Sequence, residues 1–157
     1  MTFVHILGWV QDSYLITQLR GAHHLVIEIT EVLHVLGLVS FLAVLVLVNL
    51  RLLGLGLRAV PHPQIAAAVA PLLWGGLALT VLTGTTLFLS GPVRYFYNSA
   101  FVPKMALLGL ALLVQLTLYR KVTQAEKVAP WLAQGSAVLS LSLWLGVGLF
   151  GRAIGYV

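Results

Sequence analysis

Residues 24–50 read HLVIEITEVLHVLGLVSFLAVLVLVNL, an almost uninterrupted apolar stretch. A helix needs about 20 consecutive, mainly apolar residues to span the hydrocarbon core of a bilayer. Comparable stretches follow at about 65–90, 103–120 and 130–152. The sequence therefore predicts an all-α integral membrane protein with four transmembrane helices in an up-down-up-down bundle.

The first twenty residues differ from these spans. The segment from about 3 to 20 mixes apolar and polar residues and contains Trp9 and Tyr14, residue types that prefer the membrane–water interface. It predicts a helix lying in the plane of the interface. The first residues lack the basic region of a secretory signal, so we expect them to belong to the mature protein. Residues 1–157 are expected to form a single four-span domain.

The composition narrows the function classes. The chain is 60% hydrophobic and 8% charged, and its net charge is +5. In a soluble protein this charge would suggest nucleic acid, but the basic residues lie mostly at span ends, where they meet lipid phosphates. Nucleic acid is therefore excluded as a partner. Since the chain has no cysteine, it cannot form a disulfide, a thiolate metal site or a covalent c-type haem attachment.

Basic residues also predict the orientation. The loops after the first and third spans carry Arg51, Arg58, Arg120, Lys121 and Lys127, and the other side carries Arg20, Arg94, Lys104 and Arg152. If Lys104 and Arg152 point into the bundle and are left out of the count, five basic residues on the first side face two on the other. Because basic loops stay in the cytoplasm, we expect both termini in the periplasm.

One leaflet of the expected bundle collects most of the intramembrane polar groups. It receives Glu28, Glu31, His34, Thr83, Lys104 and Arg152. At 100° per residue, the two carboxylates and His34 form one stripe, and His34 lies about 15 Å below His24, inside the hydrocarbon. Charge at that depth is costly, so the sequence predicts a buried polar cluster of Glu28, Glu31 and Thr83 beside a functional site.

These polar residues also have structural explanations. Glu31 could pair with Arg152 or Lys104 and fix the helix register. His34 could hydrogen-bond a threonine or a backbone carbonyl of a neighbouring helix. Gln115 lies in mid-span and needs a partner, which could be the bundle interior, His34, a ligand or another subunit.

Small residues and turns complete the expectations. Two stripes predict close helix contacts: Gly76, Thr80 and Gly84 in the second span, and Ser136, Ser140 and Gly148 in the fourth. Pro61-His62-Pro63 predicts a rigid turn with a solvated His62. The loop 93–102, with Arg94, Tyr95, Phe96 and Tyr97, predicts an aromatic belt.

Several of these residues together resemble a known family. Glu31-Val32-Leu33-His34-Val35-Leu36-Gly37, Asn49 to Gly54, Thr83-Gly84 with Leu87-Phe88, Asn98 to Phe101 and Lys104 resemble an uncharacterised family of small four-helix bacterial inner-membrane proteins. The resemblance covers nearly the whole chain and implies fold and location, but no function.

A fainter resemblance extends to CopD-type copper-resistance proteins and to HemJ-type protoporphyrinogen oxidases, which bind haem b. Their shared His, Arg and Lys correspond to His34, Arg51 and Lys104. The HemJ pattern has a further His about eleven residues after the Lys, and this chain has Gln115 there. A haem held by two histidines of one subunit is therefore not expected.

Three functions compete at this stage. In a cytochrome-b-like or haem/quinone-associated redox protein, His34 would ligate haem b, Lys104, Arg94 or Arg152 would pair with its propionates, Gln115 could contact the ligand, and quinone would be the electron partner. The alternative is a non-catalytic structural or accessory subunit that joins other membrane subunits or a homo-oligomer.

A copper or proton conduit through Glu28, Glu31 and His34 is the third hypothesis. Copper(I) prefers soft ligands, and the chain offers only Met1 and Met105. No nucleophile, base and orienting group occur together, so no catalytic residue is predicted.

Overall fold

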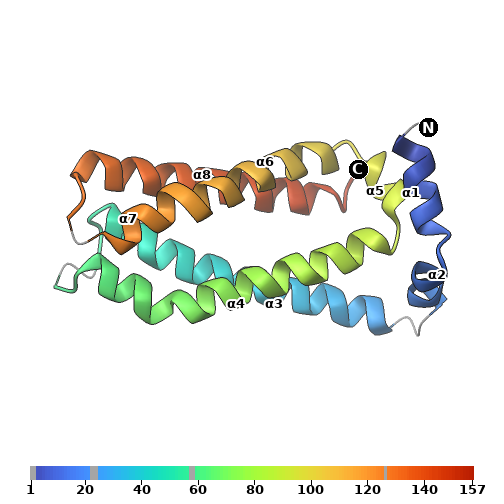
Figure 1. Cartoon of the computed structure of the whole chain (residues 1–157), viewed down its shortest axis with the longest axis horizontal. Coiled ribbons are helices and arrows are strands. Elements are labelled where there is room, and N and C mark those ends of the chain that lie inside the picture. Colours follow the sequence, from blue (N-terminus) through green and yellow to red (C-terminus); the bar gives the residue numbers. More distant parts are fainter. Residues whose placement is uncertain (1–2, 22–24, 57–58, 126) are drawn as a thin grey trace.

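The computed structural model describes residues 3–21, 25–56, 59–125 and 127–157 (Figure 1). Within these residues the chain is helical and forms no strand. The expectations for His24, Arg58 and the side chain of Arg20 lie outside the described part.

Long apolar helices form the body of the structure. They are α3 (Leu25–Leu52), α4 (His62–Leu89), the continuous span α6 (Phe101–Val114), η1 (Gln115–Tyr119) and α7 (Arg120–Gln124), and α8 (Pro130–Ala153). In the described part, these four spans are long and apolar enough to cross a membrane. Successive spans run in opposite directions (Figure 1). The all-α, four-span membrane fold is therefore confirmed.

Short helices gather at one end of the bundle, beside the C-terminus (Figure 1). They are α1 (Phe3–Gln11), α2 (Tyr14–Gly21) and α5 (Pro92–Phe96). The helical N-terminal segment forms two short helices, because the chain turns at Asp12 and Ser13 between α1 and α2. Helix α1 packs against α5, so the N-terminal segment covers this end of the bundle.

Proline marks where three helices begin. Pro63, Pro92 and Pro130 lie at the first positions of α4, α5 and α8, where a missing N–H costs nothing. His62 is therefore the first residue of a helix and not part of a separate turn. Its Nε2 lies 2.9 Å from the carbonyl oxygen of Ala125, so His62 ties the start of α4 to the end of α7. The expectation of a solvated His62 is wrong.

Glycine lets α3 and α4 touch along their backbones. A Cβ on Gly76 would lie 2.8 Å from the backbone nitrogen of Phe41 and 2.9 Å from the carbonyl oxygen of Gly37. No side chain fits there, which confirms the close contact predicted for this stripe. On α8 the prediction is wrong for Gly148, since a Cβ there would meet no described atom within 4 Å.

Buried side chains fill the core between α3, α8 and the η1–α7 part of the third span. Phe41 and Trp144 pack edge to face with ring centroids 4.4 Å apart, and Trp144 Nε1 donates to Gln115 Oε1 at 3.3 Å. One turn farther along each antiparallel helix come Leu45, Tyr119 and Ser140, and then Asn49, Thr123 and Ser136. All nine side chains are buried. The core is therefore polar as well as apolar in the half of the bundle that contains α7.

Candidate functional site

A large cavity lies in the half of the bundle that is capped by α1 and α5. Its volume is about 870 Å³, within the range that small-molecule and cofactor sites occupy. The walls come from α3 and α4 on one side and from α6 and α8 on the other, and Leu7 of α1 and two aromatic residues of α5 lie at its end. Most of the lining is apolar, and the polar groups include Glu31, His34, Lys104 and Arg152.

His34 enters this cavity from α3 with a defined hydrogen bond. Its Nδ1 lies 3.0 Å from Thr83 Oγ1 of α4. The Thr83 hydroxyl donates its single proton to the carbonyl oxygen of Leu79, 2.6 Å away, so it accepts a proton from His34. This arrangement favours the His34 tautomer with hydrogen on Nδ1, which would leave a lone pair on Nε2.

Gly84 makes room for this imidazole. A Cβ at Gly84 would lie 2.9 Å from His34 Cε1 and 3.4 Å from Nδ1. The expected close contact at Gly84 is confirmed, and its partner is the ring of His34. The structural explanation that the sequence offered for His34, a hydrogen bond to a threonine, is also realised. The two interpretations do not compete, because the bond to Thr83 uses only one ring nitrogen.

Two cations line the cavity in different ways. Lys104 is partly buried on α6, and a Cβ on Gly151 of α8 would lie 3.6 Å from its Nζ. Arg152 is exposed at the end of α8, where it donates to the Tyr156 hydroxyl at 2.6 Å and lies over that ring at 4.9 Å. Both cations line the cavity, but only Lys104 is partly buried, and Arg152 stays exposed.

The carboxylates are not arranged as expected. Glu31 lines the cavity but is exposed, and in the described part of the chain it forms no ion pair with Lys104 or Arg152. Glu28 is exposed and lies outside the cavity lining. The predicted buried cluster is thus wrong for both carboxylates and correct for Thr83. Both stay exposed together with most other side chains at this end of α3, where no residue before Gly37 is buried.

Two other predicted ligand contacts lie elsewhere. Arg94 is exposed on α5 and does not line the cavity. Gln115 is completely buried, and its amide oxygen accepts the hydrogen bond of Trp144, a residue of the cavity wall. Gln115 therefore supports the wall from the core side and does not contact His34.

Aromatic residues that were not predicted as site residues close the cavity. Phe88 and Phe101 stack with centroids 5.3 Å apart, and Tyr95 packs on Phe101 at 5.8 Å. These rings come from α4, α5 and α6 and all line the cavity. The aromatic loop was the available signal, but it suggested only a membrane-surface belt. Met105, which brings a thioether to the same cavity, was considered only for copper.

Among the described residues, His, Asp and Glu do not gather in groups of three that could hold a metal ion. A copper conduit through Glu28, Glu31 and His34 therefore lacks a ligand set in the described structure.

Comparisons with known proteins place the chain in a family. No curated protein and no solved structure matches it. A family model described as "Family of unknown function (DUF6644)" matches residues 6–157, which is nearly the whole chain. The chain therefore belongs to this family of unknown function.

Proposed function

We propose that the protein is a haem-b-associated redox protein of the bacterial inner membrane, in which Nε2 of His34 would bind the haem iron. One observation carries this proposal: Nδ1 of His34 lies 3.0 Å from the Thr83 hydroxyl, which itself donates to Leu79, so this contact favours a free lone pair on Nε2. Metal-ligating histidines usually donate their second ring nitrogen to such an acceptor, which fixes the tautomer and orientation.

The cavity has features that suit haem b. It is large, mainly apolar and lined by Lys104 and Arg152, which could neutralise two propionates. Arg94, the third cation expected to do so, is not in the lining. Met105 also lines the cavity, and its thioether is a residue type that holds haem iron together with His in some cytochromes. His34 and Met105 come from α3 and α6, which belong to the two opposite walls.

Bound haem would supply one-electron transfer, and the chain's residues would set its surroundings. Thr83 holds the imidazole, Lys104 brings positive charge, and the Phe88–Phe101 stack shields the cavity from water. Quinone is the electron partner we propose, because it is dissolved in the bilayer that surrounds the four spans.

The likeness to HemJ-type proteins supports this proposal only at His34 and Lys104. The third corresponding residue, Arg51, lies at the far end of α3, where its Nε donates to the carbonyl oxygen of Val60 at 2.9 Å. It has a structural role in the loop and is not part of the cavity lining.

An accessory subunit is the second candidate. The supporting observation is the third span, Phe101–Gln124. Of its most apolar 18 residues, only 11% are buried within the described chain. Leu110, Leu113 and Leu116 are exposed along it. This surface could pack against another membrane subunit or a second copy of the chain, as well as against lipid.

We place both termini in the periplasm. The lining of the cavity includes Lys104 and Arg152, which supports leaving them out of the count of basic loop residues. The cavity would then lie in the periplasmic half of the membrane. A C-terminal reporter fusion active only in the cytoplasm would contradict this orientation.

The haem proposal is tested by visible absorption spectra of detergent-purified protein, oxidised and then reduced with dithionite, after expression with haem supplied. We expect a Soret band that His34→Ala abolishes. His62→Ala is the matched control, since His62 lies at the opposite end of the bundle. Met105→Leu should shift the spectrum without removing the band. A colourless wild-type protein would reject haem and favour the accessory subunit.

A further inference from the structure

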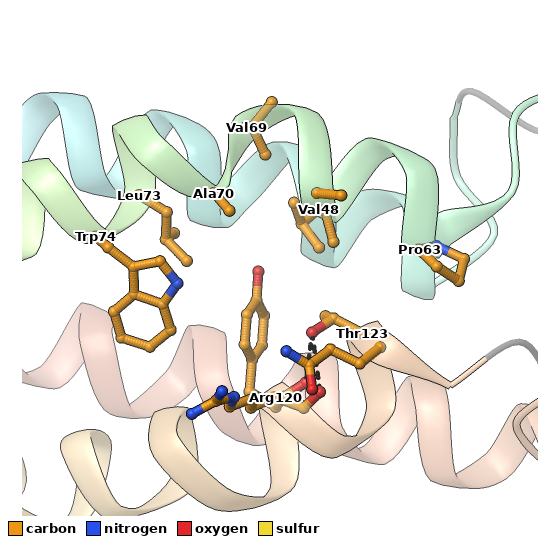
Figure 2. Close-up of a pocket in the computed structure, with 12 residues that line it drawn as sticks. Val48, Pro63, Val69, Ala70, Leu73, Trp74, Arg120 and Thr123 are labelled. Atoms are coloured by element: carbon orange, nitrogen blue, oxygen red, sulfur yellow. Dashed lines mark hydrogen bonds between the residues drawn. The ribbon is translucent and has the colours of Figure 1, made fainter.

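A second cavity lies at the other end of the bundle, between α4 and the segment formed by η1 and α7. Its volume is about 290 Å³. Figure 2 shows Val48, Ala70 and Leu73 on one side of it and Arg120 and Thr123 on the facing segment. The walls are mainly aliphatic. On the α4 side, the short side chains of Ala66, Ala67 and Ala70 leave space in the cavity.

The hydroxyl of Tyr119 is the unusual group at this cavity. Tyr119 is 3% exposed, it lines the cavity, and its hydroxyl has no hydrogen-bond partner in the described structure. Buried hydroxyls in native proteins are almost always paired. The nearby Thr123 hydroxyl donates to the carbonyl oxygens of Tyr119 and Arg120, at 2.9 and 3.3 Å. In the described structure no acceptor therefore lies within hydrogen-bonding distance of the Tyr119 hydroxyl.

A cation lies beside this donor near the membrane surface. Arg120 is exposed and lines the cavity, and it is four residues before the end of the third span at Gln124. At 1.5 Å per residue, this places its Cα about 6 Å from the end of the helix. Arginine at this level can meet the phosphate of a lipid headgroup.

We propose that this cavity binds one phospholipid. An acyl chain would fill the aliphatic space between α4 and α7, an ester carbonyl would accept the hydrogen bond of Tyr119, and the phosphate would pair with Arg120. The lining favours a flexible chain over a planar ring, because Trp74 and Tyr119 are the only aromatic residues among those that form this cavity in the described structure. The site is independent of the haem proposal.

The test titrates delipidated protein in detergent with palmitoyl-oleoyl phosphatidylglycerol, and native mass spectrometry counts the lipids bound. We expect one lipid to bind more tightly than the rest. Tyr119→Phe and Arg120→Gln should each weaken this binding roughly three- to tenfold, as expected for the loss of one hydrogen bond. Tyr97→Phe and Lys121→Gln are matched controls, since both residues are exposed and neither lines the cavity.

Thermal unfolding gives a second readout. Without lipid, Tyr119→Phe should unfold at the same temperature as the wild type or higher, because it removes an unpaired hydroxyl. With phosphatidylglycerol the order should reverse, and the space-filling Ala70→Phe should lose the stabilisation by lipid.

Two results would overturn the proposal. One is equal lipid affinity of the wild type, Tyr119→Phe and Arg120→Gln. The other is stabilisation by decylubiquinone but not by phosphatidylglycerol, which would identify a quinone ring as the acceptor for Tyr119.

Discussion

The contact between Gly84 and His34 predicts a graded series of glycine substitutions in α4. Gly84→Ala would place a Cβ 2.9 Å from His34 Cε1, so the ring must move and its bond to Thr83 must lengthen. Overpacking costs about 1–3 kcal/mol, the hydrogen bond contributes about 1 kcal/mol, and alanine regains about 1 kcal/mol of helix propensity. We expect a net loss of about 1–3 kcal/mol.

Two other glycines of α4 should give a smaller and a larger loss of stability than Gly84 when replaced by alanine. Gly75→Ala meets no described atom within 4 Å, so it should be neutral or stabilising by up to about 1 kcal/mol. Gly76→Ala would place its Cβ 2.8 Å from a backbone nitrogen of α3, which cannot swing aside, so it should be the most destabilising. Thermal unfolding in detergent measures the order, with about 2–4 °C per kcal/mol. If Gly76→Ala unfolded together with Gly75→Ala, the close packing of α3 on α4 would be refuted.

Two further predictions concern residues whose roles the structure has revised. Glu31→Gln and Glu28→Gln should unfold at the same midpoint in detergent, because neither carboxylate is paired with a cation in the described chain; a much lower midpoint for Glu31→Gln alone would restore the ion pair suggested by the sequence. Gln115→Leu should leave the Soret band of the haem-loaded protein unchanged, because Gln115 contacts Trp144 and not the cavity; loss of the band would make Gln115 part of the cofactor site.

The spans were predictable because bilayer insertion depends on length and apolarity, which are properties of local sequence. The contact of Gly76 with α3 was predictable for a similar reason, since small residues spaced by four mark close helix packing. The proximity of Thr83 to His34 was predictable because both lie at the same end of a bundle whose spans alternate in direction.

The side chains for which the prediction failed depend on how closely the helices pack. The positions of Glu28, Glu31 and His34 along α3 follow from the sequence, but the structure leaves this end of α3 largely exposed, so both carboxylates are exposed while His34 meets Thr83. The π-helical turn from Gln115 to Tyr119 is a second example. Within this turn Gln115 bonds to Trp144, and Tyr119 lines the smaller cavity. The sequence contains no pattern that predicts this change of helix geometry.

The position of both cavities follows from which helices pack closely. Helix α3 packs along α4, α6 along α8, and the Phe41–Trp144 contact joins α3 to α8. Helix α4 meets the third span mainly at α7, so the remaining seam of the bundle, between α4 and α6, is the least tightly closed. Both cavities have α4 on one wall and the third span on another. Because this seam faces the bilayer, an apolar ligand of either cavity can arrive sideways through the membrane, and no aqueous entrance is required.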